Sequence, residues 1–279
     1  MPQIYDLEIS TKDLNDFLED VWNTYSTDFR EYGKAHLKRR IRHRMTMAKY
    51  SSFEEMREDV IKNKWAYKGL FKDFSINVTE LFRDPEFYQQ LYHILLAEKR
   101  EKGIDIWVTA SASGEEAYSI VMMLEHFGIK YGKIIASDFN PDIVEYAAQG
   151  KIDSNKINEY KRNLNKTGFE LNLEDFFNNE GDHYQLKEKY LSKIEFITHN
   201  LLNEYSKSKF DLVLCRNVLI YFEKNLQNRV VNHLSDSLPC EGILCLGSKE
   251  SLRFMDAYSS FSTVNQVHKI YQKKNCFDS

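Results

Sequence analysis

Residues 104–138, "IDIWVTASASGEEAYSIVMMLEHFGIKYGKIIASD", decide the fold. The segment begins with a short apolar run, turns at a glycine into a helical pattern, and ends in a second apolar run that closes on an acid. Apolar runs that alternate with helical segments are typical of parallel strands joined by crossover helices. Similar runs at 193–200, 210–217 and 241–248 continue the pattern. We therefore predict an α/β fold with a doubly wound sheet.

The rest of the chain carries other patterns. Residues 11–70 contain no convincing strand and place apolar residues at helical spacing, which indicates a small helical region. Residues 151–190 are polar and weakly periodic, and we interpret them as an insertion with a functional role, because they exceed a normal connection. The tail, 261–274, has strand composition and is expected to close the sheet as an antiparallel hairpin.

Composition indicates a folded globular protein. The chain has 279 residues, 42% of them hydrophobic, which suffices either for one sizeable core or for one core with a small accessory domain. A net charge of -4 does not suggest a general nucleic-acid binder. No apolar run approaches the roughly 20 residues that cross a bilayer, and the first residues lack a secretory signal, so we expect a cytoplasmic protein. The four cysteines lack C-x-x-C spacing, so we expect reduced thiols and neither a disulfide framework nor a zinc site.

The turn "TASASGEEAYS" at 109–119 is the first candidate ligand site. Gly114 allows a tight turn and close approach of a ligand, and Glu115 and Glu116 open the next helix. These acids either serve only the helix dipole or meet a nucleotide-like ligand that carries positive charge and no phosphate. Asp138 follows the second strand, where an acid commonly accepts from ribose hydroxyls. Without a G-x-G-x-x-G motif, the pattern favours S-adenosylmethionine over NAD.

Two further stretches place polar residues next to the expected start of a helix or inside an apolar strand pattern. In "INVTELFRDPEFYQQL" at 76–91, a helix-start signal follows Arg83, so the segment is either a capped linker helix or a closure over the top of the sheet. In "LVLCRNVLIYF" at 212–222, a guanidinium interrupts a buried strand pattern, and guanidinium groups are seldom buried without partners. We expect the strand to end near Cys215, which places Arg216 in the ligand crevice at the carboxyl edge of the sheet.

The stretch "GKAHLKRRIRHRM" at 33–45 is a short basic helix with one apolar face. A charged helix of this kind is usually a solvated face. The functional alternative is that an acidic partner docks on it.

Six motifs, in this order and at these separations, resemble the CheR-type chemotaxis receptor methyltransferases. They are "NVTELFRD", "SGEEAYSI", "ASDFNPDIVEYAAQGKI", "HNLL", "FDLVLCRNVLIYF" and "GILCLGSKESL". The resemblance implies an N-terminal all-helical domain at 1–75 with the basic helix. It also implies a Rossmann-like S-adenosylmethionine-dependent methyltransferase domain at 76–279, with a small antiparallel β-subdomain inserted at about 151–195.

The resemblance further implies methyl transfer from S-adenosyl-L-methionine to glutamate side chains on the cytoplasmic helical bundle of chemoreceptors. The products would be glutamate methyl esters, for sensory adaptation, and S-adenosyl-L-homocysteine. The protein would be a monomer with no nucleic-acid partner, no metal and no membrane insertion. Carried over motif by motif, Arg83 and Tyr221 would be catalytic, and the cofactor would be bound by Asn77, Thr79, Arg83, Gly114, Glu116, Asp138, Asn200, Leu201, Arg216 and Asn217. The basic residues Arg39, Arg40 and Arg42 would bind the receptor.

Two alternatives stay open. A methyltransferase for RNA or another substrate would use the basic helix to follow phosphates, and its binding would weaken steeply with salt. A cofactor-binding signalling scaffold would keep the cofactor pocket but would not catalyse methyl transfer.

Overall fold

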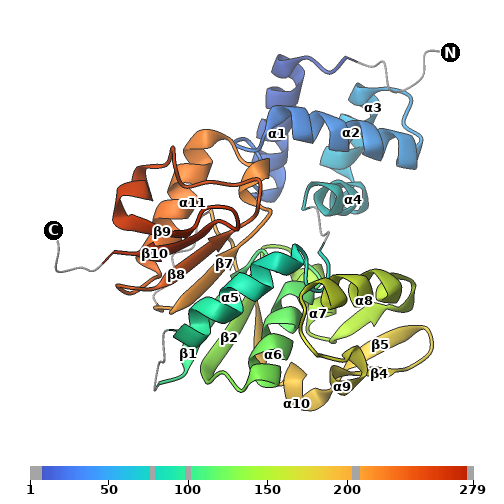
Figure 1. Ribbon diagram of the computed structural model, residues 1–279. Coiled ribbons are helices and arrows are strands. Elements are labelled where there is room, and N and C mark those ends of the chain that lie inside the picture. Colours follow the sequence, from blue (N-terminus) through green and yellow to red (C-terminus); the bar gives the residue numbers. More distant parts are fainter. Residues whose placement is uncertain (1–7, 76–78, 98–101, 203–207, 275–279) are drawn as a thin grey trace. The chain divides into compact units, whose positions relative to one another are not determined.

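The computed structural model describes residues 8–75, 79–97, 102–202 and 208–274. The chain forms two compact units (Figure 1). One unit comprises Met1–Ile76 with Tyr221–Gln227, and the other comprises Asn77–Ile220 with Asn228–Ser279. The sequence prediction had assigned all of 76–279 to the methyltransferase domain, and the units differ from it at Ile76 and at Tyr221–Gln227.

Four helices in the described part of the first unit carry apolar residues at helical spacing. They are α1 (Thr11–Tyr25), α2 (Lys34–Ala48), α3 (Phe53–Lys62) and α4 (Lys64–Phe74). On α2, the buried residues Leu37, Ile41 and Met45 recur every four positions, which puts them on one face of the helix. Ser10 and Ser52 cap α1 and α3 by accepting backbone N–H bonds.

The second unit contains a seven-stranded sheet in the order β6-β2-β1-β7-β8-β10-β9. The five strands from β6 to β8 are parallel, and the terminal hairpin β9–β10 adds antiparallel strands, as the sequence predicted. The strands are β1 (Ile104–Thr109), β2 (Tyr131–Asp138), β6 (Ile194–Thr198), β7 (Leu212–Cys215), β8 (Ile243–Leu246), β9 (Phe261–Asn265) and β10 (Ile270–Lys273). The strand order reverses between β1 and β7, which is where open α/β folds bind ligands.

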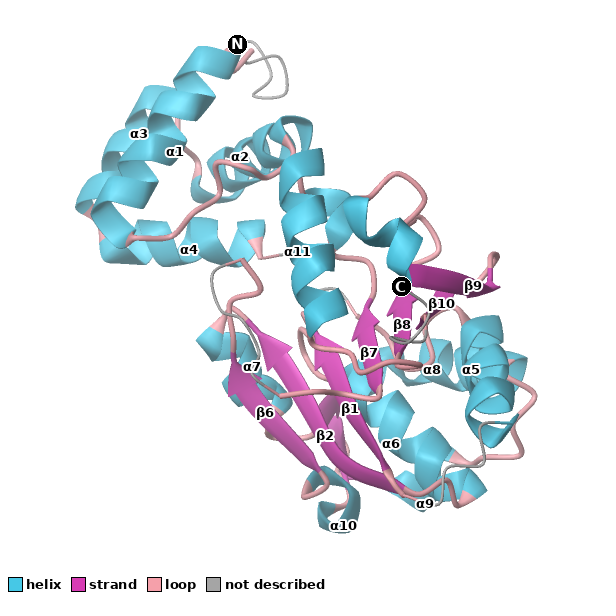
Figure 2. Ribbon diagram, turned by 90° about the vertical axis from the view of Figure 1, so that its left-hand side faces the viewer, coloured by secondary structure: helices cyan, strands magenta, loops and turns pink. Residues whose placement is uncertain are grey.

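Helices cover both faces of this sheet (Figure 2). The α6 face carries the main apolar core, to which β1 contributes Ile106 and Val108. The intervening Trp107 points to the opposite face, where its ring lies 5.8 Å from that of His233 in α11. The helices in this part of the chain are α5 (Pro85–Ala97), α6 (Glu115–Phe127), α7 (Pro141–Ala147) and α11 (Lys224–Asp236), with the short helices η3 (Leu219–Tyr221) and η4 (Asp256–Ser260).

An inserted subdomain lies between α7 and β6. Its antiparallel sheet has the order β3-β5-β4, which confirms the inserted β-subdomain expected from the family resemblance. The insertion also contains helices that the weak periodicity had not indicated. Its elements are β3 (Lys151–Asp153), η2 (Ser154–Lys156), α8 (Ile157–Lys166), α9 (Leu173–Phe176), β4 (Phe177–Asn179), β5 (His183–Leu186) and α10 (Glu188–Leu191).

The expectation that all four cysteines are reduced is wrong for Cys240. Cys215 and Cys245 are buried free thiols, but Cys240 is disulfide-bonded, whereas all cysteines were expected to be reduced. Cys240 follows a proline in a turn ahead of β8, and no spacing rule signalled it.

Candidate active site

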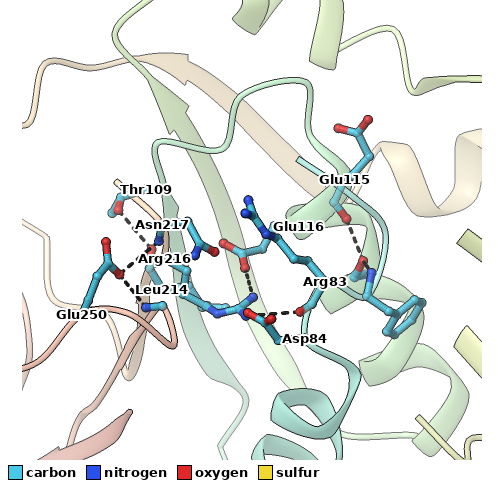
Figure 3. A network of polar contacts seen from close by, with 12 residues as sticks. Arg83, Asp84, Thr109, Glu115, Glu116, Leu214, Arg216, Asn217 and Glu250 are labelled. Atoms are coloured by element: carbon cyan, nitrogen blue, oxygen red, sulfur yellow. Dashed lines mark hydrogen bonds and ion pairs between the residues drawn. The ribbon is translucent and has the colours of Figure 1, made fainter. Parts of the chain in front are cut away.

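Arg216 follows the last residue of β7 and is almost fully buried. Its side chain is 2% exposed. One terminal nitrogen bonds the Glu116 carboxylate at 2.5 Å, and the other bonds Asp84 at 2.8 Å and the Arg83 carbonyl at 3.2 Å (Figure 3). The guanidinium carbon also lies 4.0 Å from the ring centre of Phe87. Arg216 therefore joins three segments at the carboxyl edge of the sheet, as a cation whose partners offset its desolvation.

The segment ahead of α5 is held in a strained conformation. Phe82 and Asp84, on either side of Arg83, have positive φ values of 51° and 57°. The Phe82 N–H donates to Ser119 of α6 at 2.8 Å, which fixes the segment against the first helix of the sheet. Arg83 itself is half-buried. The expected helix start at Asp84-Pro85 is confirmed, because α5 begins at Pro85.

Backbone strain concentrates at this edge of the sheet. Each non-glycine residue in a left-handed conformation costs of the order of 1–3 kcal/mol and persists only where its surroundings hold it. Nine such residues occur in the described ranges, and five lie in three neighbouring loops of this site: Phe82, Asp84, Ala110, Ala112 and Asn217. The other four are at helix ends and in turns elsewhere. Strain gathered in this way marks the three loops as a candidate functional site.

The glycine turn connects β1 to α6 as the sequence indicated. Gly114 has a φ of +97°, and a Cβ atom there would lie 2.7 Å from the Tyr118 ring, so no other residue fits without a shift. The two acids that follow point in opposite directions (Figure 3). Glu116 meets Arg216, whereas Glu115 is 3% exposed and bonds Ser113 at 2.6 Å and Tyr160 at 3.1 Å.

Asp138 ends β2 and is 5% exposed. Its two oxygens accept N–H bonds from Ala112 and Asn140, both at 3.0 Å. Burial raises the pKa of Asp138 to about 6, although the backbone donors act against the rise. The carboxylate thus fixes the glycine turn beside the end of β2, and its pKa lies where small changes in pH alter its charge.

Asn200 and Leu201 follow the end of β6. Asn200 is half-buried, and its side-chain oxygen accepts from the Leu202 N–H at 2.9 Å. Leu201 is 9% exposed. Because β6 is parallel to β2, these residues lie at the same edge of the sheet as Asp138, whose carbonyl accepts from the His199 N–H at 2.9 Å.

Glu250 is a residue of this region that the sequence analysis did not select. It is 5% exposed and accepts backbone N–H bonds from Asn217 at 3.0 Å, Leu219 at 2.7 Å and Gly247 at 2.5 Å. Burial raises its pKa, and the three donors partly offset that rise. Glu250 shapes the loop after β7, including the left-handed Asn217. The sequence feature that could have identified Glu250 is its position as an acid shortly after the apolar run of β8.

Three further residues that the sequence analysis assigned to the site are Asn77, Thr79 and Tyr221. Asn77 lies outside the described residues, and Thr79, half-buried, begins the described segment that leads to Arg83. Tyr221 belongs to the helical unit, where its carbonyl accepts from Gly33 at 2.8 Å and its ring centre lies 4.7 Å from that of His36.

The basic residues of α2 also belong to the helical unit. Arg39 is exposed, whereas Arg40 and Arg42 are half-buried. Arg39 donates to His36 at 3.2 Å. Burial, with the charges of Arg40 and Arg39, lowers the pKa of His36 to about 4, so His36 is neutral and accepts this bond. Arg44 instead pairs with Asp73 at 2.6 Å, within the same unit.

The residues of the second unit fit S-adenosylmethionine. The turn after β1 consists of small residues around Gly114. The neighbouring acids are Asp138, which is buried, and Glu116, whose side chain is 12% exposed. Such a set suits a cationic nucleoside without phosphates and disfavours a dinucleotide. Within the described ranges, no cluster of three or more His, Cys, Asp or Glu side chains is arranged to hold a metal ion. No helix within those ranges is long and apolar enough to cross a membrane.

Two family models together match most of the chain. The CheR methyltransferase all-alpha domain matches residues 12–75, and the CheR methyltransferase SAM binding domain matches residues 77–270. Chemotaxis protein methyltransferases from Listeria monocytogenes and Listeria innocua are each 32% identical, over 89% of this chain and 92% of theirs. The solved N-methyltransferase NodS from Bradyrhizobium japonicum, in complex with S-adenosyl-L-homocysteine, is 15% identical with a TM-score of 0.37, over 60% of this chain and 62% of that one.

The matches establish the enzyme class. The protein is an S-adenosylmethionine-dependent methyltransferase with an all-helical N-terminal domain and an α/β catalytic domain. The chain belongs to the CheR methyltransferase family.

Proposed function

We propose that this protein methylates glutamate side chains on the cytoplasmic helices of chemoreceptors. The observation that carries the proposal is the match to chemotaxis protein methyltransferases along 89% of the chain, because that length includes both the basic helix and the cofactor site. The reaction would form glutamate methyl esters in the cytoplasm and adjust receptor output.

The chemistry requires positioning more than acid–base catalysis. When bound, S-adenosylmethionine supplies an electrophilic methyl group on a sulfonium. A glutamate carboxylate is already ionised at neutral pH, so a residue of this chain need not remove a proton from it. Aligning a nucleophile with its target can contribute several kcal/mol to rate. Reaction of an anion with a cation also cancels both charges, so a site that excludes water favours it.

Arg83 is the side chain that we assign to the acceptor carboxylate. The left-handed residues on both sides of it fix the direction in which it leaves the backbone, and its carbonyl is bound by Arg216. A guanidinium can hold one carboxylate oxygen while the other attacks. Contacts that are too strong would lower the reactivity of the carboxylate, so Arg83 should favour the transition state over the bound substrate.

Tyr221 is the second side chain assigned to the acceptor. The helical unit holds it through the Gly33 hydrogen bond and the His36 ring contact. Its phenol would donate a hydrogen bond to the same carboxylate, which makes Tyr221→Phe a separate test of that role.

The cofactor roles follow from the site's acids and loops. Asp138 would accept from the ribose hydroxyls, and Glu116, oriented by Arg216, would meet the cationic amino-acid end. Asn200 and Leu201 would contact the adenine. Gly114 and Asn217 would contact the cofactor through their backbones, and Asn77 and Thr79 would complete the site from the segment before Arg83.

The α2 residues Arg39, Arg40 and Arg42 would bind the receptor. Their positive charge suits an acidic helical surface, and attraction of this kind speeds encounter more than it tightens the final complex. We propose that the protein binds the receptor as a monomer.

The experiment that tests the proposal compares acceptors. Purified receptor cytoplasmic fragments and total RNA are each incubated with the protein and methyl-labelled S-adenosylmethionine. We expect label on the receptor fragment and none on RNA. Label that nuclease treatment releases from RNA, with an unlabelled receptor fragment, would overturn the proposal.

A further inference from the structure

The helix α8 of the inserted subdomain contacts two segments of the candidate cofactor site. One is the start of α6, directly after the glycine turn, and the other is the segment before Arg83. Tyr160 of α8 is fully buried and donates to the Glu115 carboxylate at 3.1 Å. One helical turn later, the Asn163 amide donates to the Leu81 carbonyl at 3.1 Å and to Glu80 at 3.2 Å. Residues three apart share one face of a helix, so α8 presents both donors to the site.

Glu115 connects these contacts to one another. Its carboxylate accepts from Ser113 in the glycine turn at 2.6 Å, in addition to Tyr160. Its backbone carbonyl accepts from the Ser119 hydroxyl at 2.7 Å, and that hydroxyl accepts from the Phe82 N–H at 2.8 Å. One buried residue thus joins α8, the glycine turn and the strained segment around Arg83.

The carboxylate of Glu115 faces away from the Arg216 cluster (Figure 3), so it does not share the role of Glu116. A buried carboxylate is costly unless hydrogen bonds satisfy it. Ser113 and Tyr160 supply two such bonds. Loss of either donor would therefore disturb the glycine turn rather than merely remove a surface contact.

We propose that α8 is a positioning element of the cofactor site, with Tyr160 and Asn163 as its positioning residues. Tyr160 acts through Glu115 on the glycine turn, and Asn163 acts on the segment before Arg83. The inserted subdomain would then do more than extend the surface, since its first helix would set the geometry in which the cofactor is held. This inference rests on the proposed assignment of these two segments to the cofactor site.

Tyr160→Phe is the primary variant, because it removes one hydroxyl and keeps the buried ring. In the full chain, we expect affinity for S-adenosylhomocysteine, measured by calorimetry, to fall about tenfold, as for a lost hydrogen bond to a charged group. Amide hydrogen exchange of residues 110–116 should become faster. Tyr184→Phe is the matched control, because Tyr184 lies in β5 of the same subdomain and its hydroxyl accepts a bond from Asn179 at 3.3 Å.

The pH profile of binding distinguishes positioning from a general loss of stability. Burial raises the pKa of Glu115, and the Tyr160 donor acts against that rise. The titratable groups that face this carboxyl are Tyr160, Tyr118 and Tyr146, with Lys156 as the nearby cation. Removing the phenol should raise the pKa of Glu115 further, so affinity should begin to fall at a higher pH than in the wild type.

Asn163→Ala is the second variant, and it keeps the test open should Tyr160→Phe unfold. We expect it to lower affinity severalfold and to increase exchange around residues 80–83. If both variants bind S-adenosylhomocysteine like the wild type, with unchanged exchange, α8 does not position the site and the inference is wrong. If the wild type itself fails to bind S-adenosylhomocysteine, the assignment of the cofactor site fails instead, and this inference falls with it.

Discussion

The candidate cofactor site and the basic helix α2 both contain arginine, but in opposite environments. The Arg216 side chain is 2% exposed and bonded to two carboxylates, whereas Arg39 is exposed and Arg40 and Arg42 are half-buried. A buried charge interacts strongly with its partners, while water and salt screen an exposed one. Arg216 should therefore determine the shape of the site, and the α2 arginines should determine how fast a partner arrives.

Removal of Arg216 should have the largest effect on stability. Arg216→Met leaves the Glu116 carboxylate, which is 12% exposed, next to Asp84 without its cation, so we expect the free energy of unfolding to fall by about 3–5 kcal/mol. Urea unfolding, followed by far-UV circular dichroism, measures it. Arg30→Met is the matched control, because Arg30 also pairs with two carboxylates but its side chain is 36% exposed. That control should cost about 0–1 kcal/mol, and equal losses in both variants would remove the contrast.

Asp138→Ala tests the buried acid as a ligand contact. Loss of a charged acceptor for two ribose hydroxyls should weaken cofactor binding by about 1.5–3 kcal/mol. Calorimetry with S-adenosylhomocysteine at a pH well above the pKa of Asp138 measures this. Unchanged affinity would refute the ribose role.

Arg83→Ala should separate catalysis from binding. The side chain is half-buried and assigned to the acceptor, so we expect kcat to fall about tenfold to a hundredfold, which is roughly 1.4–2.7 kcal/mol. Affinity for S-adenosylhomocysteine should change much less. Equal losses in kcat and in cofactor affinity would mean that Arg83 only binds the cofactor.

Cofactor affinity should depend on pH through Asp138. Its pKa in the folded protein, about 6, is above its ordinary value of 3.8. The folded state therefore favours the protonated acid, and the stability that this group contributes decreases as pH rises through about 6. Binding has the opposite dependence, because only the ionised form accepts from both hydroxyls. We expect affinity to decline as pH falls through about 6, and Asp138→Ala should lack this decline.

The α2 substitutions should have the smallest effect on stability. Replacing Arg39, Arg40 and Arg42 one at a time with Ala should change the free energy of unfolding by about 0.5 kcal/mol or less. KM for the receptor fragment should rise at low salt, and the difference from the wild type should shrink at high salt. A KM that is independent of salt would exclude an electrostatic role for α2.

Sequence patterns predicted the elements around the candidate site better than its internal contacts. The end of β7 at Cys215, the helix start at Pro85 and the terminal hairpin all followed from local signals. The partners of Arg216 did not, since Asp84 and Glu116 are 132 and 100 residues away in the chain.

Other features of the site also lay beyond local patterns. Glu250 acts through three backbone donors, and backbone groups leave no trace in a side-chain motif. The sequence also placed Tyr221 with the methyltransferase domain, whereas its contacts with Gly33 and His36 group it with the helical unit. Long-range pairing of this kind depends on tertiary packing, which periodicity does not report.

The most direct test of the account is the chemical nature of the transferred methyl group. A receptor cytoplasmic fragment is labelled by this protein with S-adenosylmethionine, isolated and treated with mild base. We predict that base releases the label as methanol, and that replacing the acceptor glutamates of the fragment with glutamine abolishes transfer. Label that survives base, or transfer that persists without those glutamates, would contradict methyl ester formation on glutamate.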